Sequence, residues 1–126
     1  EAHKWTEKQL KAGVLASDIA KGFLKFFEDN GRRQNYVYGP CHGTGIIEVE
    51  APWMETTSDY LLQPNMTFQI DTFVMGPDFG LRWEKPIAIT FVSGPTFGLR
   101  WEKGIVITEN GFESNCDELK YIELDF

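Results

Sequence analysis

The sequence predicts an α+β fold, with helices near the N-terminus and an antiparallel sheet after them. Three observations support this class. Apolar residues recur at helical spacing within residues 18–29, β-branched and aromatic residues alternate with polar ones later in the chain, and one segment occurs twice in tandem. Hydrophobic residues make up 42% and charged residues 25% of the 126 residues, which indicates a packed core. We expect one domain over residues 1–126.

Two helices are expected at the start of the chain. Residues 1–11 lack Pro and Gly and are rich in helix formers, so we expect the end of a helix there, with a break at Gly13. Ser17 is a suitable N-cap for a second helix, and Gly31 is the expected left-handed cap after it. This second helix, about residues 18–29, presents one apolar face made by Ile19, Phe23, Phe26 and Phe27.

The remaining elements are expected to be strands. Residues 36–38 form a predicted short strand before the turn at Gly39-Pro40, and residues 46–49 form a second. Residues 66–74 alternate and are rich in β-formers, which predicts a longer strand. The acidic tail contains an alternating stretch at 121–124, which we expect to be an edge strand.

The tandem repeat is the most unusual feature of the sequence. Residues 72–89 read TFVMGPDFGLRWEKPIAI and residues 90–107 read TFVSGPTFGLRWEKGIVI, so chance is excluded. Each copy has a Gly-Pro-x-Phe-Gly turn between β-rich runs, which is typical of a hairpin. Two copies are too few for a solenoid. We therefore expect a local duplication that adds a strand or a loop.

Composition and charge exclude several classes of protein. The net charge of −7 and the pI of about 4.8 disfavour nucleic acid as a partner, because an acidic surface repels phosphate. No apolar run approaches the ~20 residues needed to span a membrane. Cys41 and Cys116 are too few for a disulfide framework, so we expect free thiols in a reducing, cytoplasmic location. The chain begins with Glu, so we expect it to be processed or part of something longer.

Three segments, in order, carry a resemblance to a known family. The first runs from Gly39-Pro40-Cys41-His42-Gly43-Thr44-Gly45 to Glu50-Ala51-Pro52 and resembles a His-Gly-x-Gly motif followed by His-Glu-x-Pro. Residues 62–71, LQPNMTFQID, are similar to a Pro-Gly-Met-x-Phe-x-Ile-Glu/Asp strand. Residues 100–111, RWEKGIVITENG, resemble an Arg-x-Glu strand that runs into Val-Thr-x-x-Gly. Together they resemble peptidase family M24, the superfamily of methionine aminopeptidase, Xaa-Pro aminopeptidase, prolidase and creatinase.

The resemblance implies a partial pita-bread fold, the C-terminal half of such a domain, with N-terminal helices packed on a curved antiparallel sheet. It also implies a divalent metal cofactor (Mn, Co, Fe or Zn) and a peptide substrate if the chain is active. The family holds two metal ions with two Asp, one His, one Glu or Asp, and one Glu. His42 matches the ligand His, Asp71 the acidic ligand and Glu102 the final Glu. An imidazole with hard carboxylate oxygens suits these metals.

The sequence also departs from the family pattern. The two Asp ligands of the first half are absent, and Asp18 and Asp29, although their spacing imitates that pair, are expected to be solvated on a helix. Val49 stands where the family often has a second His, and Cys41 stands where Gly is usual. We therefore expect a metallopeptidase-like fragment, an aminopeptidase of the Xaa-Pro type by resemblance, that is inactive as this chain. The alternatives are a non-catalytic, self-associating remnant or half of a creatinase-like amide hydrolase, and we expect a homo-oligomer.

The duplication leaves the third ligand open between two residues. Glu84 and Glu102 occupy equivalent places in the two copies. A meander would place Glu84 beside Asp71, whereas an extra unit that loops out would leave Glu102 there. We expect the site to be vestigial if the His42 and Asp71 side chains lie on opposite faces or more than about 10 Å apart. A turn residue is the other interpretation of His42, His3 is expected to be exposed, and a Cys41–His42 nucleophile is rejected because neighbours on an extended chain point to opposite faces.

Overall fold

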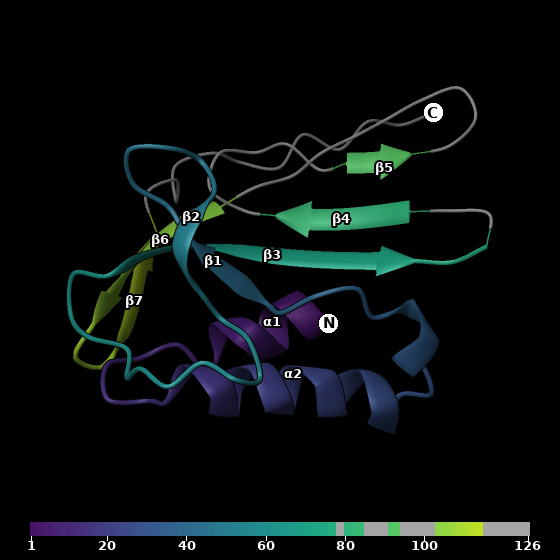
Figure 1. Ribbon diagram of the computed structural model, residues 1–126, viewed down its shortest axis with the longest axis horizontal. Coiled ribbons are helices and arrows are strands. Elements are labelled where there is room, and N and C mark those ends of the chain that lie inside the picture. Colours follow the sequence, from purple (N-terminus) through teal and green to yellow (C-terminus); the bar gives the residue numbers. More distant parts are fainter. Residues whose placement is uncertain (78–79, 85–90, 94–102, 115–126) are drawn as a thin grey trace.

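Two helices pack against one side of an antiparallel sheet (Figure 1). The computed structural model describes residues 1–77, 80–84, 91–93 and 103–114, with the backbone alone for 81–84, 91–93 and 103. Within these residues the sheet order is β2-β1-β3-β4-β5, and β6 pairs with both β3 and β7. The strands are β1 (Cys41–Gly43), β2 (Glu50–Trp53), β3 (Thr67–Met75), β4 (Gly80–Glu84), β5 (Phe91–Ser93), β6 (Lys103–Thr108) and β7 (Gly111–Ser114).

Both predicted helices are present. α1 spans Ala2–Glu7 and α2 spans Ala16–Asp29. Gly13 and Gly31 have φ angles of 81° and 65°, a left-handed conformation that glycine adopts without a steric penalty. The chain therefore ends α2 where the sequence indicates, whereas α1 ends at Glu7, before the expected break at Gly13.

The start of α2 differs from the prediction. The N-cap is Leu15, not Ser17, and Ser17 is buried within the first turn. Leu15 has an extended backbone and forms a β-bridge with Leu61, and the backbone N–H of Ala16 donates to the carbonyl of Tyr60. Because this bridge holds Leu15 extended, the helix begins directly after it.

Two predicted strands are wrong. Residues 36–38 form no strand, since only Tyr36 makes an isolated bridge, with Val74. They follow the short 3-10 helix η1 (Arg33–Asn35). Residues 46–49 are an exposed loop instead, with Ile46 99% exposed. The Glu50 carboxylate accepts a hydrogen bond from the N–H of Ile47 and closes this loop, so the strand starts at Glu50.

The long strand predicted at 66–74 is confirmed as β3, and its alternation divides the sheet into two faces. Phe68 and Ile70 are buried in the apolar core on the helix side. Gln69 and Asp71 alternate with them and are buried on the opposite face. The apolar core is formed by Leu10, Ala16, Ile19, Ala20, Cys41, Met54, Leu62, Phe68, Ile70, Ile105 and Ile107.

The repeat adds a strand to the sheet. β3 and β4 form an antiparallel hairpin, and β5 pairs with the other edge of β4 (Figure 1). Arg82 on β4 is paired with Phe73 on one side and Phe91 on the other. These two phenylalanines are the second residues of the two copies, 72–89 and 90–107. β4 therefore lies between two copies of one strand in the same register.

β4 and β6 together line one edge of β3. β4 pairs with the half of β3 from Asp71 to Met75, and β6 pairs with the half from Thr67 to Ile70. From Asp71 to Ile70, the partner changes from Glu84 to Lys103, so the pairing skips residues 85–102. The skipped segment has the length of one repeat unit. β4 and β6 thus lie end to end along β3, as one continuous strand would if residues 85–102 were removed.

Some predictions lie outside the described residues, namely the edge strand at 121–124, Cys116 and Glu102. Of the helices that the structure describes, none has the length and apolar character needed to cross a membrane.

Candidate functional site

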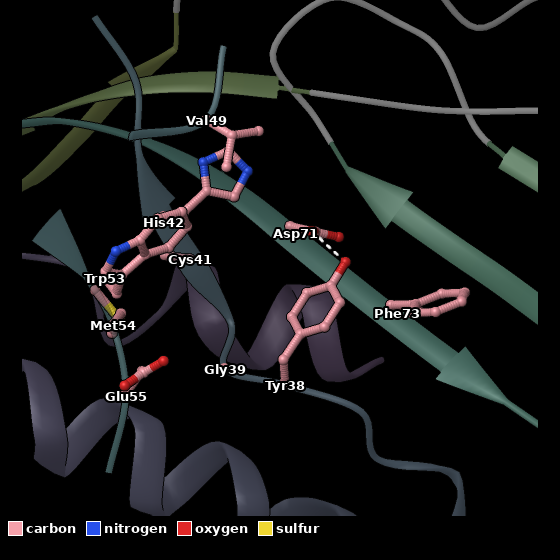
Figure 2. A pocket seen from close by; sticks show the side chains of 10 residues that line it. All are labelled: Tyr38, Gly39, Cys41, His42, Val49, Trp53, Met54, Glu55, Asp71 and Phe73. Atoms are coloured by element: carbon pink, nitrogen blue, oxygen red, sulfur yellow. Dashed lines mark hydrogen bonds between the residues drawn. The ribbon is translucent and has the colours of Figure 1, made fainter. Parts of the chain in front are cut away.

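A pocket of about 730 Å³ opens where the sheet's polar face meets the chain before β1 and the end of β2 (Figure 2). Its walls come from parts of the chain that are distant in sequence. The lining residues are Tyr38, Gly39, Cys41, His42, Val49, Trp53, Met54, Glu55, Asp71 and Phe73. Two of the predicted metal ligands, His42 and Asp71, line the same cavity.

His42 is held on β1 with one ring nitrogen available. The side chain is 5% exposed, and Nδ1 lies 2.9 Å from the carbonyl oxygen of Gly43. A carbonyl only accepts, so Nδ1 carries the hydrogen and the neutral ring has its lone pair on Nε2. Nε2 is buried and has no hydrogen-bond partner among the residues described. This is the tautomer that a metal-binding histidine needs, fixed by a backbone carbonyl.

Asp71 lies on β3 and is 1% exposed. Its carboxylate accepts a hydrogen bond from the hydroxyl of Tyr38, drawn as a dashed line in Figure 2. A carboxylate has two oxygens and several lone pairs, so it can accept from more than one partner at once. Tyr38 belongs to the segment before β1, far from Asp71 in sequence, and no local pattern signals this contact.

His42 and Asp71 are placed on the same face of the sheet. His42 is in register with Gln69, and Asp71 follows Gln69 by two positions. Such diagonal neighbours on adjacent strands lie about 7–8 Å apart. Of the two conditions for a vestigial site, opposite faces is therefore not met. Among the described side chains, no group of three His, Cys, Asp or Glu forms a complete metal-binding cluster.

The other predicted metal ligands and the Asp18–Asp29 pair lie in three different places. Glu84 is directly opposite Asp71 in the β3–β4 register, and its side chain is not described. Glu102 lies outside the described residues. Asp18 is exposed on α2, and Asp29 at the end of that helix makes an exposed ion pair with Lys25, so both are solvated as expected.

Cys41 is a buried, unreactive neighbour. Burial, and next the negative charge of Asp71, raise the pKa of the Cys41 thiol well above its usual value. The nucleophile in thiol chemistry is the thiolate, which these surroundings disfavour. The pKa shift supports the rejection of a Cys–His nucleophile.

Val49, which stands where the family often has a second His, lines the pocket. Five further lining residues were missed by sequence reasoning: Tyr38, Trp53, Met54, Glu55 and Phe73. The Trp53 ring lies 6.2 Å from the His42 ring, because the two residues are in register on neighbouring strands. His3, expected to be exposed, is 7% exposed in α1, with its Nε2 3.7 Å from a Glu7 carboxylate oxygen.

Comparison with known proteins agrees with this geometry. The sequence profile of metallopeptidase family M24 matches residues 1–109. The chain belongs to family M24. An M24 chain with this order of helices and antiparallel strands has part of the pita-bread fold, and solved structures support that conclusion. No curated protein sequence matches the chain.

Three solved structures show the fold. An X-Pro aminopeptidase from Thermotoga maritima is 22% identical with a TM-score of 0.70, over 90% of this chain and 27% of its own. An Xaa-Pro dipeptidase from Bacillus anthracis is 21% identical with a TM-score of 0.70, over 97% and 30%. Zn-substituted aminopeptidase P from E. coli, in complex with product, is 18% identical with a TM-score of 0.55, over 95% and 30%. The chain thus spans less than a third of each structure.

Proposed function

We propose that this metallopeptidase-like chain holds one divalent metal ion with His42 and Asp71 and does not itself hydrolyse peptides. The observation that carries the proposal is the buried Nε2 of His42, which has no described hydrogen-bond partner and lines the same pocket as the Asp71 carboxylate. A buried polar nitrogen without a partner costs about 1–3 kcal/mol. A metal ion would supply that partner.

The two residues fit a transition-metal ion by chemistry. Imidazole nitrogen with carboxylate oxygen suits Zn, Mn, Fe or Co, and a site of few ligands follows the general order of affinity instead of selecting one metal. We therefore expect Zn²⁺ to bind more tightly than Mn²⁺. When bound, such an ion would act as a Lewis acid toward an amide carbonyl. The protein's own part is to orient the donors, through Gly43 behind His42 and Tyr38 beside Asp71.

The proposed inactivity rests on the residues that would complete the site. The resemblance implies five ligands, and the sequence offers counterparts for three of them. The Asp pair whose spacing imitates the other two, Asp18 and Asp29, lies on the solvated surface of α2. Val49 occupies the pocket wall where a proton-carrying side chain is expected, and valine cannot exchange a proton.

Equilibrium dialysis against Zn²⁺ followed by metal analysis tests the binding. We expect one ion per chain, and at least about tenfold weaker binding in His42→Ala and in Asp71→Asn. Asp18→Asn is the matched control, because it removes an exposed carboxylate remote from the pocket and should bind as the wild type does. Equal binding by all four proteins, or none by the wild type, would overturn the metal site.

A separate assay tests the inactivity. Release of the N-terminal residue from Met- and Xaa-Pro-peptides should stay at background with Zn²⁺, Mn²⁺ or Co²⁺ present. Turnover above background that disappears in His42→Ala would show the chain to be a working enzyme.

Self-association is a second proposed property, favoured by apolar residues on the loop beside the pocket. Ile46 is 99% exposed, Ile47 59% and Trp53 47%. Trp53 lies on β2, an edge strand within the described sheet, so apolar surface and an open edge occur together. Such surfaces commonly mark interfaces. Light scattering at micromolar concentration should give at least a dimer, and Ile46→Lys should shift the mass toward the monomer.

A further inference from the structure

The accessible wall of the pocket carries three aromatic side chains. Trp53 is 47% exposed, Tyr38 is 37% exposed and Phe73 is half-buried. Trp53 comes from the end of β2, Tyr38 from the chain before β1, and Phe73 from β3. Figure 2 shows Trp53 on one side of the pocket and Tyr38 with Phe73 on the other. The centroids of the Tyr38 and Phe73 rings lie 5.9 Å apart, so these two rings form one continuous aromatic surface.

The charged groups on the described wall of this pocket are acidic. Asp71 and Glu55 are its carboxylates, and none of the described lining residues is Lys or Arg. Burial, and after it the negative charge of Asp71, raises the pKa of the Cys41 thiol, so the Asp71 charge acts on other groups in the wall. With His42 neutral, the pocket therefore attracts a cation and repels an anion.

The burial of the polar groups decides which kind of cation fits. Asp71 is 1% exposed and His42 5% exposed, so Glu55 is the one exposed group among the carboxylates and the imidazole of the described wall. An ammonium group with N–H donors would give up hydrogen bonds to water and find few acceptors within reach. A quaternary ammonium carries no N–H and loses none. Aromatic faces attract it, and the buried charge of Asp71 acts on it without direct contact.

We infer that this pocket binds a quaternary ammonium ligand, with its methyl groups against the faces of Trp53, Tyr38 and Phe73. The cavity of about 730 Å³ has the size of a small-molecule site, and Val49 and Met54 add apolar surface to its wall. The inference goes beyond the proposed function and does not depend on it. A quaternary nitrogen has no lone pair with which to coordinate a metal ion, so the pocket should bind this ligand in metal-free protein.

Three ligands of nearly one shape test the role of charge. Choline is the cation, its analogue with carbon in place of the quaternary nitrogen is neutral, and tert-butylacetate is an anion. Each is titrated into the full chain, kept metal-free with a chelator, and binding is measured by isothermal titration calorimetry. We expect choline to bind with a Kd of about 1 mM or below, the neutral analogue to bind at least about tenfold more weakly, and the anion not to bind.

Trp53→Leu and Trp53→Phe make a matched pair of variants that locates the ligand. Both replace a side chain that is 47% exposed, so both should fold as the wild type does, which circular dichroism checks. Trp53→Phe keeps an aromatic face and should bind choline within about twofold of the wild type. Trp53→Leu keeps only apolar surface and should bind it at least about fivefold more weakly.

The outcomes separate this inference from the metal site. If the chain binds Zn²⁺ but binds choline no better than its neutral analogue, the metal site stands and this inference fails. Equal choline binding by Trp53→Leu and Trp53→Phe would overturn it as well, because the ligand would then lie away from Trp53. Choline binding that is weakened in Trp53→Leu alone, in a chain that takes up no Zn²⁺, would support this inference and refute the proposed function.

Discussion

Deleting residues 85–102 should leave the sheet around β3 unchanged. The deletion joins Glu84 directly to Lys103, and these residues already face Asp71 and Ile70, two adjacent positions of β3. The composite edge of β4 and β6 then becomes one continuous strand. Every residue pair that β4 and β6 make with β3 keeps its register.

The expected change in stability is small and follows from two opposing terms. Removing an excursion of this length relieves a loop-closure cost of about 2.6 kcal/mol, from (3/2)RT ln n with n the number of residues removed. The deletion also removes the three residue pairs between β4 and β5, each contributing about 0.2–1 kcal/mol. The free energy of unfolding should therefore range from about unchanged to ~2 kcal/mol higher.

Deleting residues 90–107 instead provides a matched control of the same length. The two shortened proteins differ only where the first copy has Pro86 and Ala88 and the second has Gly104 and Val106. The control should be less stable than the first deletion by at least about 1 kcal/mol, because proline is disfavoured within a strand and alanine has a lower β-propensity than valine. Urea denaturation, monitored by circular dichroism, measures the free energy of unfolding of both proteins. Equal stability of the two proteins, or unfolding of the 85–102 deletion, would refute the composite strand.

Two further predictions concern Gly39, which lines the pocket, and Tyr60, whose hydroxyl donates to the carbonyl of Trp53. Gly39→Ala should lower the free energy of unfolding by about 1–3 kcal/mol in urea, because the added Cβ would overlap the Met54 carbonyl oxygen. Gly111→Ala should be neutral, because among the described residues, chain neighbours aside, no atom lies within 4 Å of its added Cβ. Burial, followed by the charge of Cys41, raises the pKa of Tyr60 to about 12. The folded-state pKa is thus above the unfolded value, so this stabilisation is present below about pH 10 and lost as pH rises toward 12. Stability curves of Tyr60→Phe should lack that alkaline loss.

The helices and β3 were predictable because their patterns are local. The apolar face of α2 recurs at helical spacing, and β3 alternates between core and polar face. Glycines with positive φ mark the breaks in both sequence and structure. Such features depend on backbone conformation and on which side of the helix or strand is buried. Both follow from residues that are close in sequence.

Most of the parts that sequence reasoning missed depend on distant residues. The short strand β1 exists because β2 and β3 flank it, although Gly39-Pro40 indicates a turn. Conversely, residues 46–49 have strand-forming side chains and form a loop, because the nearby Glu50 carboxylate closes it. The pairing of Asp71 with Glu84 instead of Glu102 could not be decided from identical sequences. It depends on which copy continues into β6, and that choice is made by the whole sheet and not by either segment alone.

A sheet that accepts a repeat in this way also tolerates changes in how many repeats a gene encodes. Near-identical neighbouring segments recombine unequally, and each event adds or removes a whole unit. Because the break falls between Glu84 and Lys103, at equivalent points of the two copies, whole units can be gained or lost without moving any residue that faces β3. The unit is also even in length, so an added strand keeps its side-chain alternation. Alleles of this chain that differ by whole repeat units should therefore share one fold and one pocket.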